Sequence, residues 1–231
     1  MRILNRVYED DAIVIVDKPA GLLVHQTKLA ERVNETVVDI LKRDLGKAVH
    51  LVHRLDRPTS GLLVLALDPK TAGVLARQFA DRSVHKEYQA IVRGWFPDSV
   101  SLNYPLVTEF GRAKEQSART DFICLARSEV NEPTGRYPTT RLSLVKAIPH
   151  TGRTHQIRRH LAHLRHPILG DSRHGDGHYN RFLKSRASDA QLMLRASRLS
   201  LNLPRCGTRR EWNAPAHTYF DQIRQALDLS I

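Results

Sequence analysis

Residues 53–66 read HRLDRPTSGLLVLA, which places one carboxylate between two guanidinium groups directly before an apolar run. The apolar residues 62–67 have the composition of a buried strand, so Asp56 is expected on the loop that enters this strand. Flanking arginines favour the ionised form of Asp56, which suits a nucleophile or a base better than a proton donor. The small residues 59–61 allow a sharp turn that brings a ligand close to the carboxylate.

A purely structural interpretation competes with this one. Asp56 could simply pair with Arg54 or Arg57 within a turn. The residue types alone do not separate the two, so other segments of the chain must decide.

Apolar patterns on both sides of this stretch predict an α+β fold with a large mixed or antiparallel sheet flanked by helices and loops. Strands are expected at residues 12–16, 62–67, 88–92, 120–126, 140–148 and 192–203, and helices at 36–42, 70–82 and 153–164. Residues 170–189 are polar and are expected to form a loop. The charged region 108–119 is expected to be an insertion or a flexible loop. Because no Pro/Gly/Ser-rich linker divides the sequence, residues 1–231 are interpreted as a single domain.

Composition points to a polyanionic partner. The 231 residues include 36 Lys and Arg against 24 Asp and Glu, a net charge of +12. The sequence pI is about 10.1. A basic excess spread over many segments favours nucleic acid over a merely solvated surface.

The sequence shows no sign of export or membrane insertion. The first residues enter a strand pattern without a signal-peptide run, and no stretch approaches the roughly 20 apolar residues that span a bilayer. Cys124 and Cys206 lack C-x-x-C spacing, so neither a zinc site nor a disulfide is predicted. We expect a soluble, cytoplasmic protein without a membrane partner.

A second motif is the basic stretch at residues 151–161, which reads TGRTHQIRRHL. Helical spacing predicts that Thr154, His155 and Arg158 share one side of a helix. A helix N-terminus adds partial positive charge for an anion, so the stretch is suited to phosphate. The alternative is a solvated basic face.

Tyr88 begins a predicted strand and could stack on a base. In isolation, the residue is more simply explained as a half-buried tyrosine of a sheet.

Metal and other common chemistries receive little support. Imidazole and carboxylate groups gather in the second half of the chain, at His155, His160, His163, His166, Asp171, His174, Asp176 and His178. No H-E-x-x-H motif is present, and the intervening arginines oppose a divalent cation. The sequence also lacks a G-x-S-x-G elbow and a Walker phosphate loop.

Taken together, segments 53–66, 86–94 and 151–171 resemble the ordered motifs of the RluA-type pseudouridine synthases. The resemblance extends from residues 17–25 to 192–196. It implies the pseudouridine synthase catalytic fold and an isomerase that converts a uridine of structured RNA to pseudouridine, with no metal and no organic cofactor. It also implies the site: Asp56 as the catalytic aspartate, Tyr88 packing against the target base, Arg158 pairing with Asp56, and Arg54 entering the helix vacated by the flipped nucleotide. Further RNA contacts are expected from His53, Arg57, Thr59, Arg153, His155 and Gln156.

The residues leave the route of catalysis open. An ionised aspartate can attack C1′ or remove the C2′ proton. In either case the uridine must leave its stack, which costs a few kcal/mol that stacking and phosphate contacts can offset.

Within the family, residues 133–141, 158–168 and 170–176 look like the TruC-like transfer-RNA branch, which predicts uridine 65 in the T stem of tRNA as the target. Arg165 and His174 stand where many relatives have glycine and tyrosine, and both fit this branch. The chain is rather short at its C-terminus for the branch, and no S4-like RNA-binding domain is expected before the catalytic region.

Three alternatives remain open at this point. One is an rRNA, or dual rRNA and tRNA, pseudouridine synthase. A second is a non-catalytic RNA-binding module, and a third is a metal-dependent nuclease or hydrolase. We expect a monomer that requires no protein partner.

Overall fold

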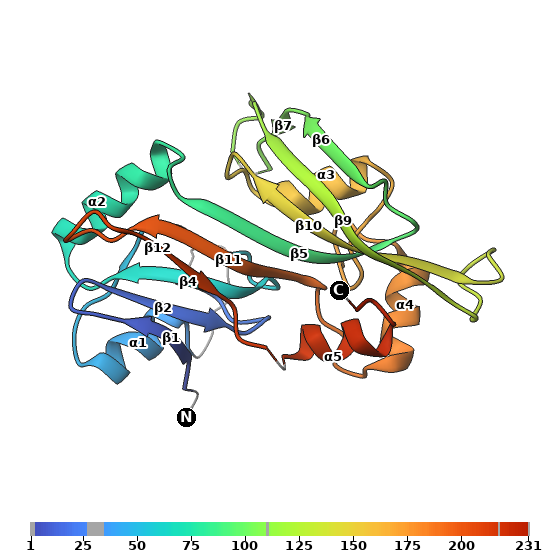
Figure 1. Cartoon of the computed structure of the whole chain (residues 1–231), viewed down its shortest axis with the longest axis horizontal. Coiled ribbons are helices and arrows are strands. Elements are labelled where there is room, and N and C mark those ends of the chain that lie inside the picture. The colour runs from blue at the N-terminus through green and yellow to red at the C-terminus, as the bar shows by residue number, and fades with distance from the viewer. Residues whose placement is uncertain (1–2, 27–34, 110, 217, 231) are drawn as a thin grey trace. The chain divides into compact units, whose positions relative to one another are not determined.

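The computed structural model describes residues 3–26, 35–109, 111–216 and 218–230. The chain divides into two compact units, unit 1 with residues 1–86 and 196–215 and unit 2 with residues 87–195 and 216–231 (Figure 1). Ten strands belong to one sheet, in the order β1-β2-β4-β11-β5-β10-β9-β6 with β12 on β11 and β3 on β4. Together with five helices in the described ranges, this confirms the α+β prediction. The interpretation of the chain as one catalytic domain stays a prediction.

Unit 1 is built on antiparallel strand pairs and two helices. The pairs are β1 with β2, β2 with β4, β3 with β4, and β11 with β12. The strands are β1 (Asn5–Glu9), β2 (Ile13–Lys18), β3 (His50–Leu51), β4 (Ser60–Ala66), β11 (Leu194–Asn202, whose first two residues belong to unit 2) and β12 (Arg209–Asn213). The helices are α1 (Val37–Leu45) and α2 (Pro69–Ala80).

Local signals explain where these helices begin. Thr36 caps α1 through a capping box with Asp39, and Asp68 caps α2 by accepting a hydrogen bond from the backbone N–H of Thr71. Pro69 occupies the first turn of α2, where its missing N–H costs nothing. The core beneath is apolar and includes residues from β2, β4, α2, β11 and β12.

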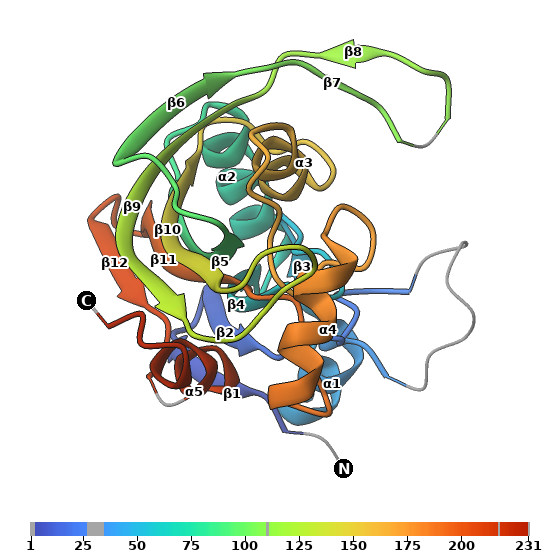
Figure 2. The same ribbon diagram turned by 90° about the vertical axis from the view of Figure 1, so that its right-hand side faces the viewer.

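Unit 2 holds the other antiparallel pairs, which are β5 with β10, β10 with β9, and β9 with β6. The long strands β9 and β10 run side by side, and β7 pairs with β8 in a separate two-stranded sheet (Figure 2). The strands are β5 (His85–Arg93, whose first two residues belong to unit 1), β6 (Ser99–Asn103), β7 (Leu106–Val107), β8 (Glu115–Gln116), β9 (Arg119–Val130) and β10 (Thr140–Pro149). The helices are α3 (Gln156–His163), α4 (Gly177–Arg186) and α5 (Tyr219–Ala226).

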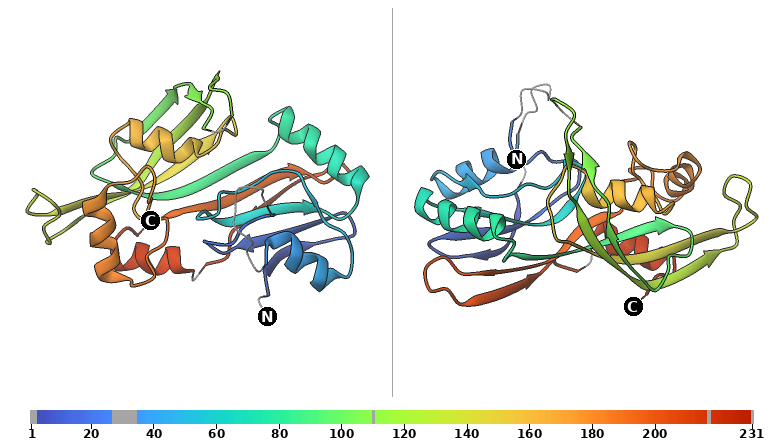
Figure 3. Two further views of the ribbon diagram at one scale, coloured as in Figure 1. Left: turned by 180° about the vertical axis from the view of Figure 1, so that it is seen from behind. Right: turned by 90° about the horizontal axis from the view of Figure 1, so that it is seen from above.

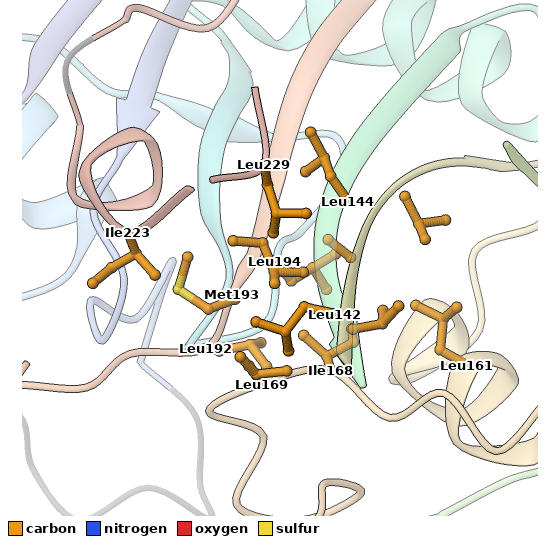
Figure 4. Packing of buried hydrophobic residues seen from close by; sticks show 14 of the residues in the cluster. Leu142, Leu144, Leu161, Ile168, Leu169, Leu192, Met193, Leu194, Ile223 and Leu229 are labelled. Carbon is orange, nitrogen blue, oxygen red and sulfur yellow. The ribbon is translucent and has the colours of Figure 1, made fainter. Parts of the chain in front are cut away.

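One apolar core holds unit 2 together (Figure 4). It joins Leu142 and Leu144 of β10 to the segments at residues 168–169 and 192–194. All three helices contribute buried residues to it, and α4 and α5 can be followed in Figure 3. No described helix has the length and the apolar composition to cross a membrane.

The predicted helix at 153–164 begins later than expected. α3 starts at Gln156, because His155 adopts a left-handed backbone with φ of 53°. Thr154 and His155 therefore precede the helix, and the prediction that they share one helical side with Arg158 was wrong.

The prediction of a loop at residues 170–189 was also wrong, because α4 occupies residues 177–186. Asp176 caps this helix, and three side chains of one face, Tyr179, Phe182 and Leu183, are buried. Most residues of the helix are polar, so the sequence pattern did not indicate its apolar face.

Candidate functional site

Asp56 lies where the sequence predicts it, on a turn that leads into β4. The backbone N–H of Thr59 donates to the carbonyl of Asp56 at 3.0 Å and closes this turn. Leu55 and Thr59 are buried on either side, whereas Asp56 is half-buried and Arg54 and Arg57 are exposed. Buried residues therefore flank Asp56 on both sides of the turn.

Lys18 fixes this turn to the loop that follows β2. Its side chain is fully buried, and its Nζ donates to the carbonyls of Pro19 at 2.9 Å, Leu22 at 2.9 Å and Arg57 at 3.1 Å. Two further bonds join the loops: the Gly21 N–H donates to the Arg57 carbonyl at 2.9 Å, and Arg57 Nε donates to the Gly21 carbonyl at 3.0 Å. Three carbonyl acceptors match the three donors of an ammonium, which makes its burial tolerable.

His53 is held inside unit 1. Its Nε2 accepts a hydrogen bond from the Val64 N–H at 3.1 Å, and its ring stacks on Phe79 with centroids 4.5 Å apart. Burial, with a smaller contribution from Lys86, lowers the pKa of His53 from 6.5 to about 3. The ring is therefore neutral at physiological pH. Its expected RNA contact stays a prediction.

Arg158 belongs to unit 2 and is 4% exposed. Its Nε donates to Asp171 Oδ2 at 2.7 Å and its Nη2 donates to Asp171 Oδ1 at 2.8 Å, which is a bidentate ion pair. Asp171 Oδ1 also accepts from the backbone N–H groups of Arg173 and His174, both at 2.9 Å. Burial alone would raise the pKa of Asp171, but Arg158 and these N–H groups outweigh it and lower that pKa. The expected pairing of Arg158 with Asp56 stays a prediction.

The turn that carries Asp171 is fixed to α4. Asn180 Oδ1 accepts from the Gly170 N–H at 2.8 Å, and Asn180 Nδ2 donates to the Asp171 carbonyl at 2.9 Å. Gly170 has a φ of 76°, and a Cβ there would lie 2.0 Å from the Gln191 carbonyl oxygen. Only glycine fits this position, so the ion pair rests on a closely packed turn.

Tyr88 lies on β5 opposite Ala147 of β10. It is half-buried and packs against the core of unit 2. This is the environment of a partly buried sheet tyrosine, and it does not distinguish the two interpretations of the sequence. Its packing against a target base stays a prediction.

Gln156 holds the loop before α3 against β9. Its Oε1 accepts from Thr151 Oγ1 at 2.6 Å and from the Arg153 N–H at 3.0 Å. Its Nε2 donates to the Arg119 carbonyl and to Thr120 Oγ1, both at 3.0 Å. The amide thus positions this loop, and the RNA contacts expected of Arg153 and Gln156 stay predictions.

His155 lies in a cluster with His174 and Glu109. His155 Nδ1 is 3.1 Å from both Glu109 Oε1 and His174 Nε2, and the possible ligand atoms all lie within 4.8 Å of one another. Arg173 lies 3.0 Å from Glu109 Oε2, and Arg159 Nε lies 3.8 Å from Oε1. Two guanidinium groups already compensate the carboxylate, so the cluster is poorly suited to a divalent cation.

Sequence reasoning missed two positioning residues, Lys18 and Asp171. A lysine is normally solvated, and only its place in the strand-ending run DKPAG at residues 17–21 signals otherwise. The sequence marks Asp171 as a possible metal ligand and as part of a segment that resembles the family, but not as a partner of Arg158. Its signal is the glycine before it, which marks a turn that fixes the acid.

Comparison with known proteins gives a consistent picture. The family described as RNA pseudouridylate synthase matches residues 12–163. A Salmonella typhimurium protein named tRNA pseudouridine synthase C is 46% identical over 213 residues, 88% of this chain and 82% of that protein. The Vibrio cholerae protein of the same name is 45% identical over 210 residues, 87% of this chain and 86% of that protein.

Two solved human structures are similar over nearly the whole chain. RNA pseudouridylate synthase domain containing 4 has a TM-score of 0.75 and 26% identity, covering 98% of this chain and 94% of that one. Domain containing 1 of the same series has a TM-score of 0.72, with 98% and 95% covered, and at 24% identity it shows the fold alone.

Proposed function

The chain belongs to the RNA pseudouridylate synthase family, and we propose that it isomerises uridine 65 in the T stem of tRNA to pseudouridine. The observation that carries the choice of tRNA is the 46% identity over 213 residues to a protein named tRNA pseudouridine synthase C. The net charge of +12 supports a polyanionic substrate such as tRNA.

The reaction moves the uracil without oxidation or reduction. The bond from N1 to C1′ breaks, a bond from C5 to C1′ forms, the hydrogen on C5 leaves, and N1 takes up a proton. Because atoms and electrons balance without a co-reactant, the proposal includes no cofactor and no metal.

Asp56 is the proposed catalytic residue. Whether its carboxylate attacks C1′ or removes the C2′ proton, it must be ionised and held at a fixed position. The buried Lys18 and the closed turn at residues 56–59 support this role, because they fix the backbone at and next to Asp56.

Tyr88 and Arg158 have the other two proposed roles. Stacking on Tyr88 would offset part of the few kcal/mol needed to extrude the uridine. Arg158 would provide positive charge beside the aspartate, and its bidentate bond to Asp171 supports a fixed guanidinium. Arg54 is proposed to enter the helix that the flipped nucleotide leaves, which its exposure permits.

The remaining RNA contacts are proposed for the polar residues of the two motifs, His53, Arg57, Thr59, Arg153, His155 and Gln156. We further propose that the protein acts as a monomer in the cytoplasm, where it would meet tRNA, and needs no protein partner. Binding should weaken steeply with added salt, because neutralised phosphates release counterions.

The test is release of tritium from tRNA labelled at C5 of its uridines. The wild-type protein should release tritium, and Asp56→Asn should release none above background. Asp11→Asn is the matched control, since this acid is also in unit 1, lies at the surface and pairs with Arg205. Wild-type turnover by Asp56→Asn would contradict the proposed role. Dialysis against a chelator should leave the rate of tritium release unchanged. Loss of activity after dialysis would favour a metal-dependent enzyme.

A further inference from the structure

A basic and aromatic surface lies in unit 2, apart from the residues given roles above. We call it the hairpin patch, and it consists of Arg136 and Tyr137 from the loop between β9 and β10 with His178 and Arg181 from α4. Arg136 Nη2 donates to the Tyr137 hydroxyl at 3.1 Å, and its guanidinium lies 5.2 Å from the ring centroid. Arg181 Nη2 lies 2.9 Å from His178 Nδ1.

The two parts of the hairpin patch are in contact. A Cβ on Gly135 would lie 3.1 Å from Cγ of His178, so the loop rests against the first turn of α4. Tyr137 is nevertheless 46% exposed, and Arg136, His178 and Arg181 are exposed as well. The patch is therefore a continuous surface whose side chains face solvent.

Nearby acids are already neutralised by other arginines. Asp176 pairs with Arg93 at 2.6 Å, and Glu132 pairs with Arg186 at 2.5 Å. Among the described residues, neither Arg136 nor Arg181 has a carboxylate partner. The patch thus presents two uncompensated guanidinium groups beside an exposed aromatic ring.

We propose that the hairpin patch binds the phosphate backbone of the tRNA substrate, an inference that rests on the proposed function. Guanidinium groups bind phosphate in a bidentate manner, and an adjoining aromatic ring offers a stacking face for a sugar or base. Clustered arginine with an exposed aromatic is typical of RNA-binding surfaces.

The patch is mechanically linked to the Arg158–Asp171 pair. α4 carries His178 and Arg181, and its Asn180 bonds both to the Gly170 N–H and to the Asp171 carbonyl. A phosphate held by the patch would therefore be held at a fixed position relative to Arg158. This predicts an effect on substrate binding and orientation rather than on the chemical step.

The location of the hairpin patch also suggests a role for two sequence segments to which no catalytic role has been given. Residues 133–141 and 170–176 resemble the TruC-like branch in the sequence, and the structure brings the first segment against the helix that follows the second. The hairpin patch is thus a candidate determinant of substrate choice.

The experiment compares charge-removing and charge-preserving variants of the full chain. Arg136→Gln/Arg181→Gln should lower the slope of log Kd against log salt for a tRNA transcript by roughly two, about 0.9 per phosphate contact. KM for tRNA should rise roughly tenfold while kcat changes less than about twofold. Arg136→Lys/Arg181→Lys should retain most of the slope, because the charges remain.

The matched control is Lys70→Gln/Arg77→Gln, which removes two exposed charges from α2 of unit 1. It should leave the salt slope within error of the wild type. An unchanged Kd and slope in Arg136→Gln/Arg181→Gln would overturn the proposal and favour a different partner, such as an acidic protein. An equal decrease of the salt slope in the control variant would also overturn the proposal, since the change in net charge alone would then explain the effect.

Failure of the proposed function gives a different result. A wild-type protein that releases no tritium from tRNA would contradict the function, while the binding measurements would still report on the hairpin patch.

Discussion

The turn that carries Asp56 and the Arg158–Asp171 pair hold their proposed catalytic groups in opposite ways. In unit 1, the backbone of the turn makes the positioning contact, through the Arg57 carbonyl, which accepts a hydrogen bond from the buried Lys18. In unit 2, the Arg158 side chain itself makes the contacts, through two bonds to Asp171. A substitution that removes a support should therefore displace a loop in unit 1 but remove a counter-charge from a buried guanidinium in unit 2.

The largest effect is expected for Asp171→Asn. It removes the bidentate counter-charge that Asp171 gives to the buried Arg158 guanidinium, so the free energy of unfolding should fall by about 3–5 kcal/mol. Urea denaturation followed by circular dichroism measures this. The double variant Arg158→Met/Asp171→Leu removes both charges and should recover much of the stability without recovering activity. A loss below about 1 kcal/mol in the single variant would mean that the pair is not the support we describe.

A smaller effect is expected for Lys18→Met. Three carbonyls lose a shared donor while the apolar stem is kept, so the free energy of unfolding should fall by about 2–3 kcal/mol. Activity should fall as well, because the turn of Asp56 loses its link to the loop after β2. Lys47→Met, at an exposed position of unit 1, is the control. Identical denaturation curves for Lys18→Met and Lys47→Met would show that Lys18 does not support the turn of Asp56.

The last effect concerns pH and His53, and it grows as the pH falls below 6.5. Its pKa is about 3 in the folded protein against an ordinary value of 6.5, so between these values the unfolded chain binds a proton that the native protein does not. The stability due to the neutral ring is complete above pH 6.5 and is lost as pH falls, by up to about 1.4 kcal/mol per pH unit.

His53→Gln keeps an acceptor for the Val64 N–H and removes this titration. The free energy of unfolding measured between about pH 6.5 and about pH 4.5 should therefore fall less steeply in the variant than in the wild type. Asp171 acts in a lower window, because its depressed pKa confers stability above its ordinary value of 3.8 that is lost as pH falls below it. Equal slopes in both proteins would show that His53 is not held neutral.

The same contrast explains what the sequence could predict. The position of Asp56 was predictable because an apolar strand and a small-residue turn are local patterns. The Arg158–Asp171 contact was not, because it joins residues 13 positions apart through a turn whose shape depends on Gly170 packing against the Gln191 carbonyl. α4 was hidden for a related reason, since its buried face holds only three apolar side chains within a polar stretch.

Basic residues were the hardest to interpret from sequence. Lys18 and Arg158 are buried, whereas Arg136 and Arg181 are exposed. The residue type alone does not predict this difference in burial. The burial of a cation depends on acceptors supplied by distant backbone or by another side chain, and these are fixed only by the fold.

The most direct test of the proposed function is to map pseudouridine at nucleotide resolution in unmodified tRNA and rRNA transcripts after incubation with the purified protein. We predict one new pseudouridine in tRNA, at uridine 65 of the T stem, with none after incubation with Asp56→Asn. Pseudouridine confined to rRNA, or absent from both RNAs, would contradict it.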